Sequence, residues 1–195
     1  MARISTVRPE EFRSDLAELL GRPTDEQRVA VGSMVGWARR PDVAITFIEF
    51  QRSLDAATTL SPRLLELVRL RVAFHNQCRS CMAVRSSRAV DDGVDSNAVC
   101  SLQRPYEAPD LSDDEKVALK YADLMANDHL SADDATFDDL RAHFTENEIV
   151  ELGIHVGICV GFGRLAATWD LVEDLPDELR TDADVAPWLV EGVQR

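Results

Sequence analysis

The spacing of apolar residues constrains this chain more than any other feature. Over most of its length they recur every three or four positions, as they do between Leu64 and Val72, whereas the alternation typical of a half-buried strand is nearly absent. Glycine and proline, 9 and 8 of 195 residues, rarely interrupt the pattern. The sequence therefore predicts an all-α protein.

Residues that start helices divide this pattern into segments. The dipeptide Ser61-Pro62 predicts a helix start, because serine caps a helix and proline is tolerated in its first turn. Ser112 with Glu115, and Thr145 with Glu148, have the spacing of a capping box. The expected helices cover residues 12–20, 29–37, 43–57, 62–72, a cysteine-bearing segment that ends at about 91, 113–124, 131–140 and a long segment that begins after 145.

The length of the chain fits a single helical domain over residues 1–195. Its core is expected at about 30–172, with a proline-containing linker at 104–112. The acidic tail at 173–195 is either an arm packed on a neighbour or a loose end. Similar residues 85 positions apart, such as Glu66-Leu67 and Glu151-Leu152, also allow a duplicated helical unit.

The charge balance excludes two classes of partner. The chain has 21 Lys and Arg residues against 35 Asp and Glu residues, a formal net charge of −14. Such a surface repels phosphate backbones and anionic bilayers, so we expect neither nucleic acid nor membrane as a partner. We find no apolar run near the ~20 residues of a membrane span and no apolar signal region at the N-terminus. We therefore expect a cytoplasmic protein.

The motif Cys78-Arg-Ser-Cys81 is the strongest indication of chemistry. Residues three apart on a helix share a face, with Cβ atoms about 5–6 Å apart, so the two thiols could form a disulfide. Arg85 is expected one helical turn beyond Cys81, where a guanidinium would favour the thiolate. His75 precedes the motif by three residues.

Two other interpretations of the cysteines stay open. They could be buried core residues that happen to align. They could also be half of a zinc site completed by Cys100, Cys159, His75 or His155, although the sequence has no second C-x-x-C or H-x-x-H pair. We expect neither metal nor cofactor. Otherwise Cys100 and Cys159 are interpreted as small core residues and His155 as a core histidine.

The run from Glu66 to Arg85 resembles the core motif of the carboxymuconolactone decarboxylase superfamily. It is more closely similar to the alkylhydroperoxidase D-like (AhpD-like) branch, which has a Glu twelve residues before a C-x-x-C, as Glu66 precedes Cys78 here. The resemblance extends over roughly residues 30–172. It implies an all-helical AhpD-like fold, assembly into trimers or hexamers, and dithiol peroxidase or disulfide reductase activity.

The resemblance also implies roles for individual residues. Cys81 would attack a peroxide, Cys78 would resolve the product to a disulfide, and an external thiol would reduce the pair. Glu66 would begin a proton relay. Twelve residues of straight helix span about 18 Å, so Glu66 reaches the thiols only if the chain turns before Cys78 or a neighbouring subunit supplies it. Alternatively, Glu66 forms a salt bridge with Arg69.

This chain departs from the family pattern at two positions. Arg85 stands where the branch has a histidine, and Ser80 stands where its peroxidases often have another. Arginine stabilises a thiolate but does not shuttle protons at neutral pH. Either His75 takes over the relay, or turnover is slow, or the substrate is not a peroxide.

The sequence is compatible with three functions. The first is a C-x-x-C oxidoreductase that reduces hydroperoxides or small disulfides. The second is a carboxymuconolactone decarboxylase-like enzyme that acts on a small organic acid or lactone. The third is a non-catalytic oligomeric redox sensor.

Overall fold

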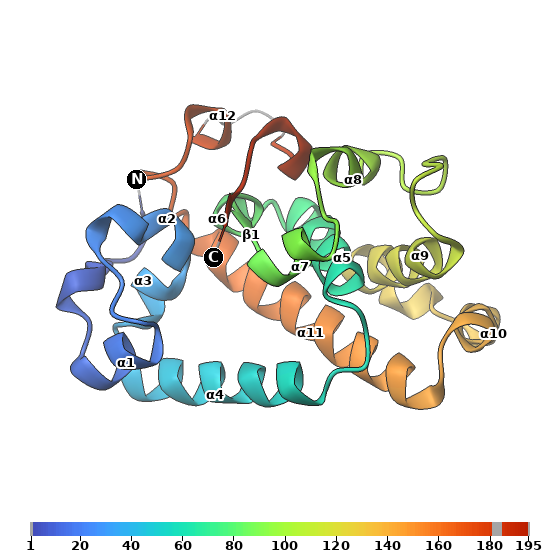
Figure 1. Ribbon diagram of the computed structural model, residues 1–195, viewed down its shortest axis with the longest axis horizontal. Coiled ribbons are helices and arrows are strands. Elements are labelled where there is room, and N and C mark those ends of the chain that lie inside the picture. The colour runs from blue at the N-terminus through green and yellow to red at the C-terminus, as the bar shows by residue number, and fades with distance from the viewer. Residues whose placement is uncertain (1, 181–184, 195) are drawn as a thin grey trace.

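The computed structural model describes residues 2–180 and 185–194, whose regular structure is almost all helical, which confirms the predicted all-α class (Figure 1). The helices are α1 (Ser14–Leu19), α2 (Arg28–Val31), α3 (Met34–Trp37), α4 (Pro41–Ala57), α5 (Pro62–His75), α6 (Arg79–Met82), α7 (Ser87–Asp91), α8 (Ser96–Ser101), α9 (Asp113–Asn127), α10 (Asp134–His143), α11 (Glu146–Trp169) and α12 (Asp177–Arg180). Four 3₁₀ turns are η1 (Pro9–Glu11), η2 (Asp25–Gln27), η3 (His129–Ser131) and η4 (Pro187–Leu189), and two short strands are β1 (Val84–Arg85) and β2 (Val193–Gln194).

Helix α5 forms the centre of the main core, where it packs against α9 and α11. It is buried on much of its circumference, as its dense apolar sequence predicts: Leu67, Val68, Leu70 and Val72 have at most 1% of their surface exposed. Figure 1 shows α11 crossing the molecule behind α5, with α9 and α10 beside its first half. A helix surrounded in this way offers a rigid base for a functional site.

The predicted helix starts are confirmed at three positions. The Ser61 hydroxyl accepts from the Leu64 N–H, and both capping boxes are present, at Ser112 and at Thr145. The segment 104–112 has neither helix nor strand before α9 begins, as expected of a linker. Helix α10 differs slightly, because its cap is Asp133, not Ser131.

Two predicted helices are interrupted. The segment 29–37 is split into α2 and α3 at Gly32, whose φ of +60° is incompatible with a continuous right-handed helix. The predicted cysteine helix is wrong in a more important way. It consists of α6, which has four residues, followed by strand β1 and then α7. Strand β1 leaves the helical path because it pairs in parallel with β2 from the far end of the chain.

The described part of the tail packs on its own chain, so it is not a loose end, and packing of residues 173–195 on a neighbouring subunit stays a prediction. Leu175, Leu179 and Val185 are buried with residues that flank the cysteine motif. Val84 pairs with Val193 in the β1–β2 ladder. Figure 1 shows the last described residues descending beside β1. The C-terminal segment is therefore part of the support of the cysteine motif.

Helices α4 and α11 are less buried than their apolar sequences suggest. Among its seventeen residues, α4 buries only Ala44 and Ile48, and it runs along one edge of the molecule (Figure 1). Helix α11 has 24 residues and is, by length and composition alone, apolar enough to cross a membrane, which corrects the expectation that no such run exists. Because α11 packs against α5, α6 and α9, we interpret it as a core helix with one uncovered face.

Candidate active site

A sharp turn after α5 brings the cysteine motif back against that helix. Helix α5 ends at His75, and Gln77 has a left-handed φ of +50°. The Cys78 N–H then donates to the Ala73 carbonyl. The Asn76 side chain fixes the turn to α11 by donating to the Cys159 carbonyl at 2.9 Å. The turn that Glu66 requires in order to approach the thiols is therefore present.

Cys78 and Cys81 are joined by a disulfide, and the two cysteines differ in exposure. Cys78 is completely buried, and its sulfur lies 3.7 Å from the Ser80 hydroxyl oxygen. Cys81 is partly buried and lines a cavity. A small molecule in this cavity would thus meet Cys81, with Cys78 behind it.

Glu66 and Arg69 form a buried ion pair next to the motif. Their side chains are 3% and 13% exposed, and two N–O distances of 2.7 Å join them. Arg69 also donates to the carbonyl oxygens of Cys81 at 2.7 Å and Val84 at 2.8 Å, while Glu66 accepts from the Ser86 N–H at 3.0 Å. The salt bridge considered from the sequence is present, and it connects Glu66 to the Cys81 backbone through Arg69.

The cavity that contains Cys81 has a volume of about 150 Å³ and mostly apolar walls. Trp37 stacks on Phe47 with ring centroids 4.9 Å apart, and Phe47 contacts Phe162 at 4.4 Å, which forms an aromatic wall. The polar groups on its surface include Arg69, Ser80 and the thiol of Cys159. This lining favours a small, largely apolar molecule.

Arg85 does not occupy the place expected for it. The interrupted helix removes it from the face of Cys81, and it is not among the residues that line the cavity. Its buried guanidinium donates instead to carbonyl oxygens of Met82, Val84 and Pro187. Burial, and to a lesser extent the charge of Arg69, lower the pKa of Arg85 to about 10, so it stays charged at neutral pH. Arg85 anchors the tail, and Arg69 is the guanidinium next to the cysteine motif.

His75 likewise faces a different part of the molecule. Its Nε2 lies 2.6 Å from the Asp123 carboxylate on α9, which also accepts from Arg71 and Tyr106. Burial opposes the charge of Asp123, but these three hydrogen bonds outweigh it and hold the pKa of Asp123 well below its usual range. His75 does not line the cavity of Cys81. Its contacts assign it to the junction of α5 and α9.

The other two cysteines, Cys100 and Cys159, lie in different environments. Cys100 is exposed on α8, so its interpretation as a core residue is wrong, whereas Cys159 lines the cavity. His155 lies one helical turn before Cys159 on α11, and this i, i+4 spacing was the available sequence signal for the pair. Residues 2–180 and 185–194 contain no group of three or more His, Cys, Asp or Glu side chains able to hold a metal ion.

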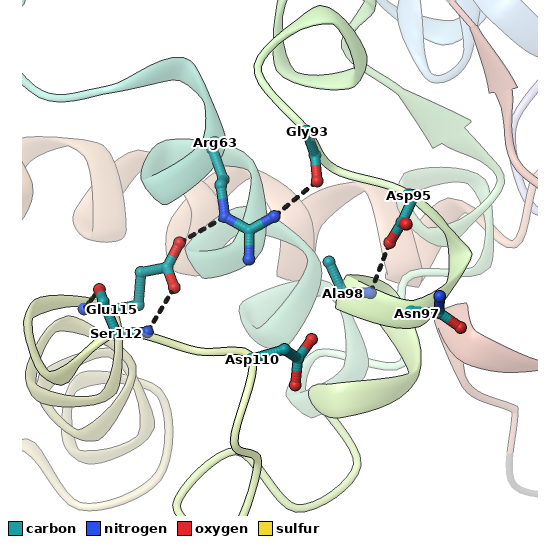
Figure 2. A pocket seen from close by; sticks show the side chains of 8 residues that line it. All are labelled: Arg63, Gly93, Asp95, Asn97, Ala98, Asp110, Ser112 and Glu115. Carbon is teal, nitrogen blue, oxygen red and sulfur yellow. Dashed lines mark hydrogen bonds and ion pairs between the residues drawn. The ribbon is translucent and has the colours of Figure 1, made fainter.

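A larger and more polar cavity, of about 490 Å³, lies near the first turns of α5, α8 and α9 (Figure 2). Its charged side chains are occupied by structural contacts. Arg63 donates to Glu115 and to the Gly93 carbonyl, and Asp95 caps α8 by accepting from Ala98. We therefore assign this cavity to the packing of helix ends, and the Cys81 cavity is the candidate active site.

The cysteine motif lies in a region that is similar to a known family. Residues 41–124, which include Glu66 and the cysteine motif, match the model of the carboxymuconolactone decarboxylase family. This part of the chain is therefore similar to the carboxymuconolactone decarboxylase family. The fold of the chain is similar to that of the "alkylhydroperoxidase AhpD core" of an uncharacterized peroxidase-related protein from Ralstonia eutropha JMP134. The TM-score is 0.73 at 19% identity, over 92% of this chain and 94% of that one.

The curated proteins to which this chain is similar include three uncharacterized ones. The uncharacterized proteins MT2376 and Rv2313c, from two strains of Mycobacterium tuberculosis, are each 32% identical over 121 residues, which is 60% of this chain. The match spans 42% of the length of each of these relatives. The uncharacterized protein YnjA of Escherichia coli is 26% identical over 141 residues, covering 72% of this chain and 75% of YnjA.

Proposed function

We propose that this chain is a dithiol oxidoreductase that reduces small organic hydroperoxides in the Cys81 cavity. The observation that carries the proposal is the bonded Cys78–Cys81 pair, of which Cys81 alone lines an apolar cavity. The fold shared with a peroxidase-related protein supports the same class of reaction. The competing function is that of a carboxymuconolactone decarboxylase-like enzyme, which would not need a cysteine pair.

The reaction would proceed in three balanced steps. The Cys81 thiolate attacks the outer oxygen of the hydroperoxide, the O–O bond breaks, and protonation of the alkoxide releases an alcohol and leaves a sulfenic acid. The Cys78 thiol then attacks the Cys81 sulfur, which forms the disulfide and releases water. Two equivalents of an external thiol reduce the disulfide and leave as a small disulfide. The full burial of Cys78 behind Cys81 supports this division of roles.

In this proposal Glu66 and Arg69 position the cysteine motif. A carboxylate that accepts two hydrogen bonds from a guanidinium is stabilised in its charged form and is therefore a weak base. A proton relay that begins at Glu66 would require this ion pair to open. Arg69 meanwhile holds the Cys81 and Val84 carbonyls and places a positive charge at the cavity wall.

Assembly and location belong to the same proposal. We expect the chain to act as a homo-oligomer in the cytoplasm, where reducing thiols can regenerate the pair. The exposed apolar side chains of α4 and α11 support assembly with further copies. The net charge of −14 continues to predict that neither nucleic acid nor an anionic membrane is a partner.

The test is to reduce the protein, remove the reductant, add cumene hydroperoxide and measure the intact mass. The proposal expects the loss of two hydrogen atoms, which requires both Cys78 and Cys81. Cys81→Ser should abolish the loss, Cys78→Ser should leave a sulfenic acid on Cys81, and Cys100→Ser is the matched cysteine control that should change nothing. An unchanged wild-type mass overturns the proposal.

The same reaction separates the alternatives. With dithiothreitol present, a peroxidase consumes many equivalents of hydroperoxide per subunit. A redox sensor would form the disulfide but would not turn over, and its assembly state would change on oxidation. An enzyme that acts on a lactone or organic acid would keep that activity in the Cys78→Ala and Cys81→Ala variants.

A further inference from the structure

Cys159 brings a second thiol to the cavity that contains Cys81. It lies on α11, whereas Cys81 belongs to α6, and both side chains line the same cavity. The closed Cys78–Cys81 disulfide leaves Cys159 as a free thiol. A molecule in this cavity therefore meets two sulfur atoms, of which the proposed function uses one.

His155 is positioned to keep Cys159 charged. Its Nε2 lies 2.9 Å from the Leu65 carbonyl oxygen and 3.7 Å from the Cys159 sulfur. A carbonyl oxygen only accepts hydrogen bonds, so Nε2 must carry a proton. The same N–H faces the sulfur, which favours a thiolate over a thiol at that position.

The charges around Cys159 act in the same direction. Burial raises the pKa of Cys159, but the charge and hydrogen bond of His155, together with the charge of Arg69, lower it below the usual value. Glu66, on the far side of Arg69, opposes this effect to a smaller extent. For His155, burial lowers the pKa, but the charge and hydrogen bond of Cys159, together with the hydrogen bond to the Leu65 carbonyl, outweigh burial and raise it. Sulfur and imidazole therefore each favour the charged form of the other.

We propose that Cys159, held as a thiolate beside His155, is a second peroxide-reactive thiol of this cavity. The Cys159 thiolate attacks the outer oxygen of an organic hydroperoxide, an S–O bond forms and the O–O bond breaks. The leaving alkoxide takes a proton from the solvent and departs as an alcohol, and the part of His155 is to stabilise the thiolate before the attack. The sulfur is oxidised to a sulfenic acid and the peroxide is reduced to an alcohol. Two equivalents of external thiol then restore the Cys159 thiol, release water and leave as a disulfide.

This inference takes its substrate class from the proposed function but does not require the Cys78–Cys81 pair to react. The disulfide-closed form therefore isolates it. In a Cys100→Ser background with the disulfide closed, Cys159 is the remaining free thiol of a chain with four cysteines. Cumene hydroperoxide is added to this protein with dimedone, which traps sulfenic acids, and peptide mass spectrometry locates the adduct.

We expect a dimedone adduct on Cys159 and none after Cys159→Ser. Because loss of the imidazole raises the pKa of the Cys159 thiol and so lowers its thiolate fraction at pH 7, His155→Gln should slow trapping at pH 7 several-fold. The same substitution should also raise the pH at which the trapping rate is half-maximal. His143→Gln, which changes a histidine bound to Asp114 at the start of α9, is the matched control and should leave both values unchanged.

Two results would overturn the inference. One is a Cys159 that stays unmodified in the folded, disulfide-closed protein. The other is an adduct whose pH profile matches an ordinary thiol and does not change with His155→Gln. Neither result affects the proposed function, which is measured separately as the loss of two hydrogen atoms from the reduced pair. Conversely, a Cys159 adduct without that loss would support this inference and reject the dithiol mechanism.

Discussion

Arg69 connects the acidic group of this site to the backbone of the cysteine motif. Its guanidinium donates to both oxygens of Glu66 and to the carbonyls of Cys81 and Val84. Because both side chains of the ion pair are largely removed from water, each charge depends on the other for its stability. The position of Cys81 in its cavity therefore depends on a neighbouring charge pair.

We expect Arg69→Met to lower the free energy of unfolding by about 3–5 kcal/mol, because it leaves the Glu66 carboxylate buried without its partner. Adding Glu66→Gln to this variant should restore part of that loss, since the double variant buries no unpaired charge. Urea unfolding measures both values. Arg141→Met, which breaks an exposed ion pair, is the control and should leave stability nearly unchanged. A double variant no more stable than Arg69→Met would contradict this account.

A second prediction concerns Asp123 and the pH dependence of stability. Asp123→Asn should cost about 2 kcal/mol at pH 7, because hydrogen bonds to a charged partner are lost. The folded pKa of Asp123 lies below its unfolded value of about 3.9. Its contribution is therefore complete above about pH 4 and declines as the pH falls toward the lowered pKa.

Unfolding of the wild type and Asp123→Asn between pH 7 and pH 2 measures this contribution. The stability difference should shrink below about pH 4. Asp139→Asn, which breaks an exposed pair with Lys120, serves as the control and should show little difference at any pH. A difference that does not depend on pH would show that the charge of Asp123 does not contribute.

The tail supports the cysteine motif through one short strand pair and one arginine. Strand β2 pairs with β1, and Arg85 donates to the Pro187 carbonyl at 2.8 Å. Gly192 allows this close approach, because a Cβ at that position would lie 2.6 Å from the Cγ of Arg85 and 2.7 Å from its Nη1. The docking of the tail therefore requires a residue without a side chain at position 192.

We expect Gly192→Ala to displace the tail and lower stability by about 1–3 kcal/mol, the usual effect of inserting a methyl group into a packed site. Limited proteolysis should then cleave the tail faster than in the wild type, and thermal unfolding should begin at a lower temperature. Glu191→Ala, at the exposed neighbouring position, is the control for loss of local order. Equal cleavage rates for the wild type and Gly192→Ala would be inconsistent with this anchor.

The breaks in the helices are the part of the secondary structure that the local sequence pattern does not predict. Capped helices such as α5, α9 and α11 were predicted correctly at their starts, because the cap and the residues it bonds lie within four positions of each other. The cysteine segment was predicted as one helix because its local pattern is helical. It is interrupted at β1 by pairing with β2, more than a hundred residues later, and a local pattern carries no information about that contact.

In the whole molecule, helices α4 and α11 leave apolar side chains uncovered. The exposed ones are Val43 and Phe50 on α4, and Val150, Ile154, Phe162 and Leu165 on α11. A Cβ at Gly157 or Gly161 of α11 would meet no atom within 4 Å, so this surface has room for close contact. Such a surface is typical of an interface between subunits. Because Phe162 also lines the Cys81 cavity, assembly would cover part of its aromatic wall.

We expect Ile154→Glu combined with Leu165→Glu to reduce the molar mass measured by light scattering to that of the monomer, 21.7 kDa, because assembly would bury two carboxylates. Leu130→Glu changes a leucine that is 86% exposed on η3 and is the matched control for added charge. It should leave the mass of the assembly unchanged. A wild-type protein that is itself monomeric would reject the proposed oligomer.

Local sequence was enough to establish the helical class, most helix starts and the C-x-x-C pair, because each depends on contacts between residues a few positions apart. The partners of the candidate site residues depend on contacts far along the chain. Arg85 binds the tail, His75 binds α9, and Cys159 reaches the Cys81 cavity from α11. Which charged group meets which sulfur follows from the packing of helices, and the spacing of residues does not encode it.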